Sequence, residues 1–84
     1  MVIDPKRRQM FTDLYRLAEF YERPPFQPGD IEGNARWFEQ ANAEQFVPFC
    51  EKYPDDMLAF ALALAVLDDA NKQAVMFNRM ESVL

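Results

Sequence analysis

The sequence predicts an all-α protein, a compact bundle of three main helices plus one short helix, with a long C-terminal helix as the central element. Apolar residues recur every three or four positions over most of the chain, which is the period of a helix buried on one face. Alanine and leucine, both strong helix formers, dominate the most apolar stretch. At 84 residues the chain is expected to form a single domain.

The first helix is predicted over residues 5–22. Asp4 is a favourable N-cap residue, and Pro5 suits the first helical turn because its missing N–H would have no partner there. Apolar side chains then follow at helical spacing, broadened by Phe11 and Tyr15: Met10, Leu14, Leu17, Ala18 and Tyr21. The i,i+4 spacing of Glu19 and Arg23 predicts a small ion pair on its surface.

A proline-rich loop is predicted over residues 23–29, where "RPPFQPG" contains three prolines and ends on a glycine. We expect Phe26, in its middle, to fold back onto the core. Pro25 and Pro28 also have the PxxP spacing that SH3-like domains bind as polyproline II. Such short matches are common in turns, so a structural connector is the favoured interpretation.

The second helix is predicted over residues 31–46, with Asp30 as its N-cap. Pro48 disfavours helical geometry at the preceding residue and removes a helical hydrogen bond, so a break or kink is expected near residues 46–47. A short helix over residues 48–53 then begins with this proline in its first turn.

The last helix is predicted over residues 56–82, because Pro54 ends the short helix and leaves Asp55 as the next N-cap. Its first half is an unbroken apolar run over residues 57–67. Eleven helical residues reach about 17 Å, against the roughly 30 Å of a bilayer's hydrocarbon core. The run is therefore predicted to be a buried helix and not a membrane anchor.

A helical wheel divides this last helix into three faces. The main core face is predicted to carry Leu58, Leu62, Val66, Ala70, Met76, Phe77, Met80 and Leu84, with Ala59 and Ala63 beside it. A second apolar face, in the first half only, should pack against the second or the short helix at Phe60, Leu64 and Leu67. The solvent side is predicted to carry Ala61, Ala65, Asp68, Lys72 and Arg79.

The length of the last helix conflicts with a compact shape. Residues 56–83 would span about 42 Å, whereas a compact chain of this size is roughly 30 Å across. Either the helix breaks near residues 68–71 or its apolar end extends past the domain. The third alternative is that the whole stripe packs along the first helix.

The residues show no recognisable catalytic chemistry. The chain has no histidine and a single cysteine, Cys50, which excludes an internal disulfide and the zinc patterns built from these residues. Cys50 lies among aromatic and aliphatic residues and is predicted to be a buried apolar group. The acidic pairs at residues 55–56 and 68–69 lack the pattern of a calcium loop. We therefore expect no enzyme activity, no cofactor and no metal site.

Charge is divided unevenly along the chain, whose net charge is −5. Residues 1–29 carry 5 basic and 4 acidic side chains (+1), and residues 30–84 carry 4 and 10 (−6). An acidic surface repels phosphate backbones, which disfavours nucleic-acid binding. The N-terminus has no apolar segment of the kind found in signal peptides, so a cytoplasmic location is expected.

We expect a non-enzymatic acidic helical module that binds another protein or a second copy of itself, since the short chain has more apolar side chains than its core can bury. Candidate contact residues are Phe26, Trp37, Met76, Met80, Val83 and Leu84. One alternative is an acidic nucleic-acid mimic that inhibits a nucleic-acid enzyme. A second is a weak nucleic-acid contact through Lys6, Arg7, Arg8 and Arg16. No membrane contact or small-molecule substrate is expected.

Overall fold

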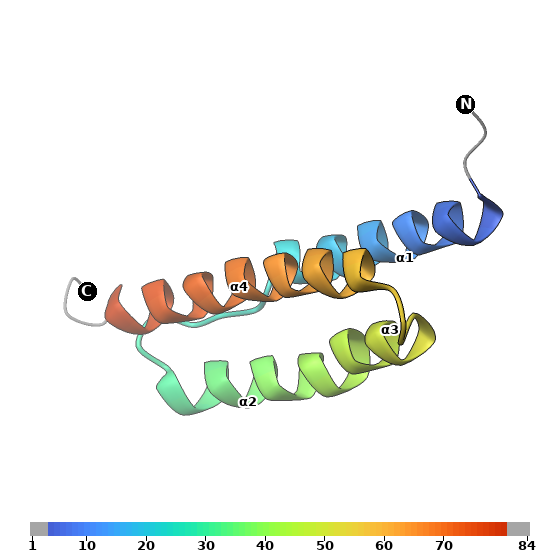
Figure 1. The fold of residues 1–84 in the computed structure, drawn as a ribbon. Coiled ribbons are helices and arrows are strands. Elements are labelled where there is room, and N and C mark those ends of the chain that lie inside the picture. The colour runs from blue at the N-terminus through green and yellow to red at the C-terminus, as the bar shows by residue number, and fades with distance from the viewer. Residues whose placement is uncertain (1–3, 81–84) are drawn as a thin grey trace.

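The computed structural model describes residues 4–80, and within them the chain is helical with no strand. α2 and α3 are joined through one π-helical turn into a single rod, so that three rods lie side by side (Figure 1). The elements are α1 Pro5–Glu22, α2 Ile31–Ala41, the π-helical turn Asn42–Phe46, α3 Val47–Lys52 and α4 Met57–Arg79. The all-α prediction, with three main helices and a short one, is confirmed. No helix in this part of the chain is long and apolar enough to cross a membrane.

α1 begins and ends where its local sequence signals predict. The Asp4 carboxylate accepts a hydrogen bond from the Lys6 backbone N–H (3.2 Å), and proline occupies the first turn. Arg23 leaves the helix with φ −129°. Among residues 4–80 no ion pair joins it to Glu19, because i,i+4 proximity requires that both residues be helical. The predicted Glu19–Arg23 pair is therefore wrong.

Pro48 widens the second rod and does not break it. The Val47 N–H donates to the carbonyl of Asn42, five residues earlier, which is the π-helical pattern. In a regular α-helix the proline ring would clash with the carbonyl of Glu44, and the wider turn gives room for it. The break expected at residues 46–47 is thus replaced by a continuous helical path through α2 and α3.

α4 is continuous from Met57 to Arg79, so it does not break near residues 68–71. Its N-cap is Asp56 and not the predicted Asp55: the Asp56 carboxylate accepts from the N–H groups of Leu58 and Ala59, both at 3.1 Å. The molecule is drawn out along its helices, with extents of 51 × 23 × 17 Å. It therefore exceeds the roughly 30 Å expected of a compact chain.

α1 and α4 run parallel, with the first turns of α1 extending beyond the start of α4, and α2–α3 runs antiparallel to both (Figure 1). Arg7 of α1 pairs with the α4 N-cap Asp56 at 3.1 Å. α1 ends before α4 does, and the proline-rich loop then takes its place along α4. The Gly29 N–H donates to the Phe77 carbonyl (3.0 Å), and the Phe26 ring lies 5.8 Å from the Phe77 ring. The last turns of α4 are thus covered by the loop on one side.

The buried face of α4 is a row of small side chains, which we call the alanine seam: Ala59, Ala63, Ala70 and Ala74. The helical wheel predicts a core face centred on larger residues, and this part of the prediction is wrong. Leu58 and Met76 are exposed, while Leu62 and Val66 are half-buried. α4 contacts α1 on one side and α2–α3 on the other. Small residues in the middle let both neighbours approach closely, so the larger ones lie at the edges.

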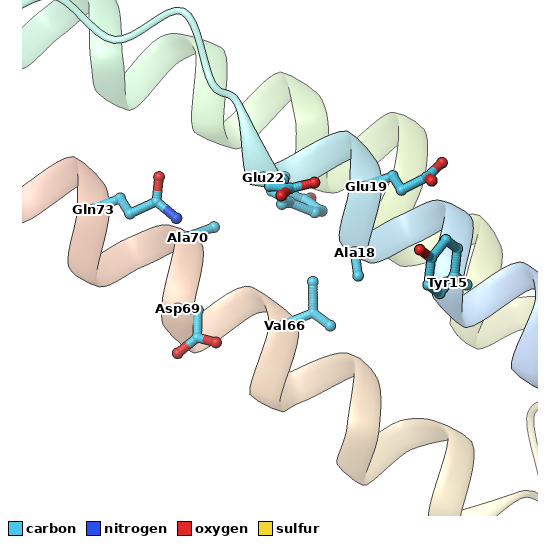
Figure 2. A pocket seen from close by; sticks show the side chains of 9 residues that line it. Tyr15, Ala18, Glu19, Glu22, Val66, Asp69, Ala70 and Gln73 are labelled. Atoms are coloured by element: carbon cyan, nitrogen blue, oxygen red, sulfur yellow. The ribbon is translucent and has the colours of Figure 1, made fainter.

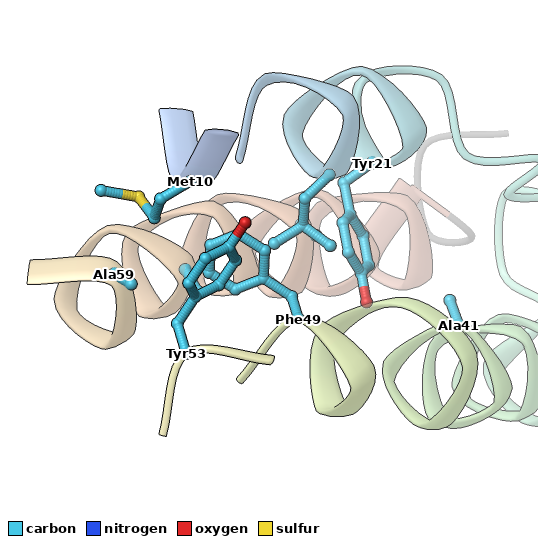
Figure 3. Close-up of a cluster of buried hydrophobic side chains, with 9 residues drawn as sticks. Met10, Tyr21, Ala41, Phe49, Tyr53 and Ala59 are labelled. Carbon is cyan, nitrogen blue, oxygen red and sulfur yellow. The ribbon is translucent and has the colours of Figure 1, made fainter. Parts of the chain in front are cut away.

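Larger side chains from the other helices close over the alanine seam (Figure 3). They come from α1, from the second rod and from the residue after it, with the small Ala41 beside them: Met10, Leu17, Tyr21, Phe49 and Tyr53. The predicted solvent side of α4 is exposed as expected. On the predicted second apolar face only Leu67 packs against the core, whereas Phe60 and Leu64 remain exposed.

Candidate functional site

Three clusters of polar side chains tie the helices together. In the first, Asp13 accepts hydrogen bonds from the Lys52 ammonium (2.6 Å), the Tyr53 hydroxyl and the Gln9 amide (2.9 Å). Partial burial opposes ionisation of Asp13, but these bonds outweigh it and hold the pKa of Asp13 below its ordinary value. The cluster joins α1 to the end of α3, which gives it a structural role.

The second cluster surrounds Asn34, which is 2 % exposed. Its amide nitrogen donates to the Gln27 carbonyl (2.9 Å) and to Asn78 Oδ1 (2.8 Å), and its Oδ1 accepts from the Gln27 N–H (3.0 Å). One side chain therefore joins α2, the proline-rich loop and the end of α4. Sequence reasoning missed this residue, although a polar residue between Ile31 and Phe38 on the apolar face of α2 is a detectable signal.

The third cluster is a single, partly buried hydrogen bond, which the Tyr21 hydroxyl donates to Asn42 Oδ1 at 2.6 Å. Burial raises the pKa of Tyr21 to about 12, so the hydroxyl stays protonated and continues to donate near neutral pH. Asn42 lies in the π-helical turn, which is thereby fixed against α1. Within residues 4–80 no three His, Cys, Asp or Glu side chains are placed so that they could hold a metal ion.

Two of the predicted contact residues, Phe26 and Trp37, pack against other aromatic rings of this chain. Phe26 is only 6 % exposed and packs edge-on against Trp37, with 5.3 Å between ring centroids. The prediction that it folds back onto the core is confirmed. Trp37 is half-buried and stacks on Phe20, with 5.8 Å between ring centroids and the ring planes nearly parallel. Both rings form part of an aromatic cluster within this chain, in which Phe26 is buried and Trp37 keeps part of its surface exposed.

The remaining predicted contact residues lie at the end of α4. Met76 is 54 % exposed and Met80 is half-buried. Together they line a shallow hollow with Lys72, Val75 and Arg79. Val83 and Leu84 lie outside the described residues.

A longer apolar surface follows the groove between α1 and α4, on the side of α1 that faces away from α2–α3. The opposite side of α1 carries Asp13 and Phe20, which contact the second rod and the residue that follows it. We call the hollow between α1 and α4 the α1–α4 groove. Its apolar part, with a volume of about 340 Å³, is lined by Phe11, Leu14, Tyr15, Ala18, Leu62, Ala65 and Val66.

The groove continues toward the end of α1 into a second hollow of about 380 Å³ (Figure 2). Tyr15, Ala18, Val66 and Asp69 line both hollows, so the two form one continuous groove. The aromatic side chains at its edge are well exposed, Tyr15 by 68 % and Phe11 by 45 %. In the sequence these two residues only widen the apolar face of the first predicted helix, and nothing there marks them as a binding surface.

The second hollow is acidic. Glu19 and Glu22 of α1 and Asp69 of α4 line it, and no basic side chain does. None of these three carboxylates forms an ion pair within residues 4–80. The acidic end of the groove therefore presents three carboxylates to solvent beside an apolar floor.

The start of α1 carries charges of both signs. Lys6 and Arg7 line a hollow together with Asp4, Asp55 and Asp56, and Arg7 is paired with the last of these. The predicted basic cluster is thus interspersed with carboxylates.

Comparisons with known proteins found no matching family model, and no similar curated protein or solved structure.

Proposed function

We propose that this chain is a non-enzymatic helical module that binds another protein, and that the α1–α4 groove is its binding surface. The observation that carries the proposal is the exposure of Tyr15 and Phe11 above an apolar floor formed by both helices. Contiguous apolar surface rimmed by polar residues is characteristic of interaction sites on small proteins.

The length of the groove is a second observation in favour of a binding role. One helical turn before Leu62 on α4, the exposed Leu58 already lines the separate hollow at the start of α1. From Phe11 to Glu22 the groove runs for about 17 Å along α1, which equals three turns of helix. This length and chemistry support a binding role for the groove, since a partner segment of three turns would cover the exposed apolar side chains.

Tyr15 supports the proposal through its chemistry as well as its exposure. A tyrosine combines a large apolar ring with a hydroxyl that can reach solvent or a partner, and such residues are enriched at protein interfaces. Within the chain Tyr15 is 68 % exposed, so its packing contributes little to the core.

The two nucleic-acid alternatives have less support. At the start of α1, a phosphate would meet Asp4, Asp55 and Asp56 beside the basic side chains, and these carboxylates would repel it. Acidic mimicry of a nucleic acid has no particular arrangement of carboxylates in its favour, and it remains a prediction from net charge.

The proposal is tested by affinity capture from a lysate of the source cells, quantified by mass spectrometry. Tyr15→Glu places a charge in the groove, and Ile31→Glu is the matched control at an exposed residue of α2. We expect a set of proteins that the wild type and Ile31→Glu retain and Tyr15→Glu loses. Circular dichroism verifies that both variants fold. If no captured protein depends on Tyr15, and sedimentation shows no Tyr15-dependent self-association, the proposal is wrong.

A further inference from the structure

We infer that the occupant of the α1–α4 groove is an amphipathic α-helix of a partner protein that carries basic side chains near one end. This inference rests on the proposed function, because it names the chemical class of the partner for the same groove.

The shape of the groove fits a helix. Two parallel helices form its walls, and it is about three helical turns long, which is the setting in which an amphipathic helix docks by its apolar face. Small side chains leave room along the groove: Ala18 of α1 points across it toward Val66 of α4 (Figure 2). Ala65 leaves similar room beside Leu62. Large apolar side chains at i, i+3 and i+7 of a docked helix would enter these spaces.

Charge determines which helix fits. Figure 2 shows Glu22 and Asp69 on opposite walls of the acidic end, with Glu19 one turn before Glu22 on α1. Lysine or arginine side chains at either edge of a docked helix would therefore each find a carboxylate without an existing ion pair. The net charge of −5 also attracts and orients a basic segment during encounter.

A second copy of this chain is the competing occupant, and charge favours it less than a basic helix. α4 carries Lys72 and Arg79 as well as Asp68 and Asp69, and Asp68 is already paired with Lys72 at 2.9 Å. Two copies that meet through α4 would therefore offer the acidic end of the groove no excess of positive charge. At the start of α1, where the chain has basic side chains, Asp4, Asp55 and Asp56 offset their charge.

The experiment uses two synthetic helical peptides of about 14 residues with the same leucine face, one with lysines and one with glutamates at the polar positions of one half. Fluorescence anisotropy measures their affinity for the full chain. The groove variant Glu19→Gln, Glu22→Gln, Asp69→Asn removes three charges, and Glu32→Gln, Glu39→Gln, Glu51→Gln removes three from the second rod as the matched control.

We expect the lysine peptide to bind the wild type, to lose roughly tenfold in affinity with the groove variant, and to change by about twofold or less with the control. An equal loss with both variants would overturn the inference, because it would show general attraction to an acidic protein. Equal binding of the glutamate peptide would also overturn it, yet would leave the proposed function intact.

Self-association distinguishes the remaining outcomes. If neither peptide binds and sedimentation shows a dimer that Tyr15→Glu dissociates, the occupant is a second copy and only the present inference fails. If neither peptide binds, no such dimer forms and no captured protein depends on Tyr15, both the inference and the proposed function fail.

Discussion

The buried side chain of Asn34 in α2 donates a hydrogen bond to the side chain of Asn78 in α4, with 2.8 Å between nitrogen and oxygen. The same amide holds both backbone groups of Gln27 in the proline-rich loop. This single residue thereby joins the loop and α2 to the last turns of α4, which α1 is too short to reach.

Asn34→Ala should destabilise the fold by about 2–4 kcal/mol, because it leaves the backbone groups of Gln27 and the oxygen of Asn78 without these partners. Urea unfolding followed by circular dichroism measures the effect. Asn78→Ala should cost less, and the double variant should cost less than the sum of the two, since both remove the same contact. A loss below about 0.5 kcal/mol for Asn34→Ala would contradict the role assigned to this residue.

Asp13 predicts a pH dependence of stability. Its pKa in the folded chain is below the ordinary value of 3.8, because hydrogen bonds from Lys52, Tyr53 and Gln9 favour the carboxylate over the opposing effect of burial. The stability it contributes is fully present above that ordinary value and is lost as the pH falls through the lower folded pKa. The difference in unfolding free energy between wild type and Asp13→Asn should therefore be largest near neutral pH and shrink in acid.

Asp55→Asn is the matched control for this measurement, since it removes one carboxylate at an exposed position without these hydrogen bonds. Unfolding in urea at a series of pH values gives both differences. A wild-type advantage over Asp13→Asn that stays constant or grows in acid would contradict the stated role of the carboxylate.

The alanine seam predicts that the same substitution changes stability very differently at neighbouring positions of α4. Ala63 is fully buried against the other helices, so Ala63→Leu should overpack the core and destabilise it by about 1–3 kcal/mol. Ala61→Leu adds the same atoms on the solvent side and should change stability by no more than about 0.5 kcal/mol. Thermal and urea unfolding compare the two, and similar losses for both variants would show that the seam is misplaced.

Local signals in the sequence predict the helices better than they predict how the helices pack. Asp4, Pro5 and the prolines that follow Arg23 define α1 without reference to the rest of the chain, and its predicted and observed bounds agree. The buried face of α4 depends on two neighbours at once. A wheel that favours the largest apolar residues therefore centres the core on Leu58 in place of Ala59.

The candidate site shows the same division. The exposed aromatic residues Phe11 and Tyr15 are visible in the sequence as a stripe too broad for one buried face. The acidic end of the groove is not visible in the sequence, because Glu22 and Asp69 are 47 positions apart. They line the same hollow only because α1 and α4 lie side by side in parallel. That alignment follows from contacts such as Arg7 with Asp56 and Gly29 with Phe77, which no local pattern contains.

Site-specific photo-crosslinking is the most direct test that the α1–α4 groove binds a protein. The full chain is produced in the source cells with p-benzoylphenylalanine in place of Tyr15, and separately in place of Ile31, which is similarly exposed on α2. We predict a discrete crosslinked partner from position 15 that is absent from position 31. The same products from both positions, or a discrete partner from position 31 alone, would contradict the assignment of the groove as the binding surface.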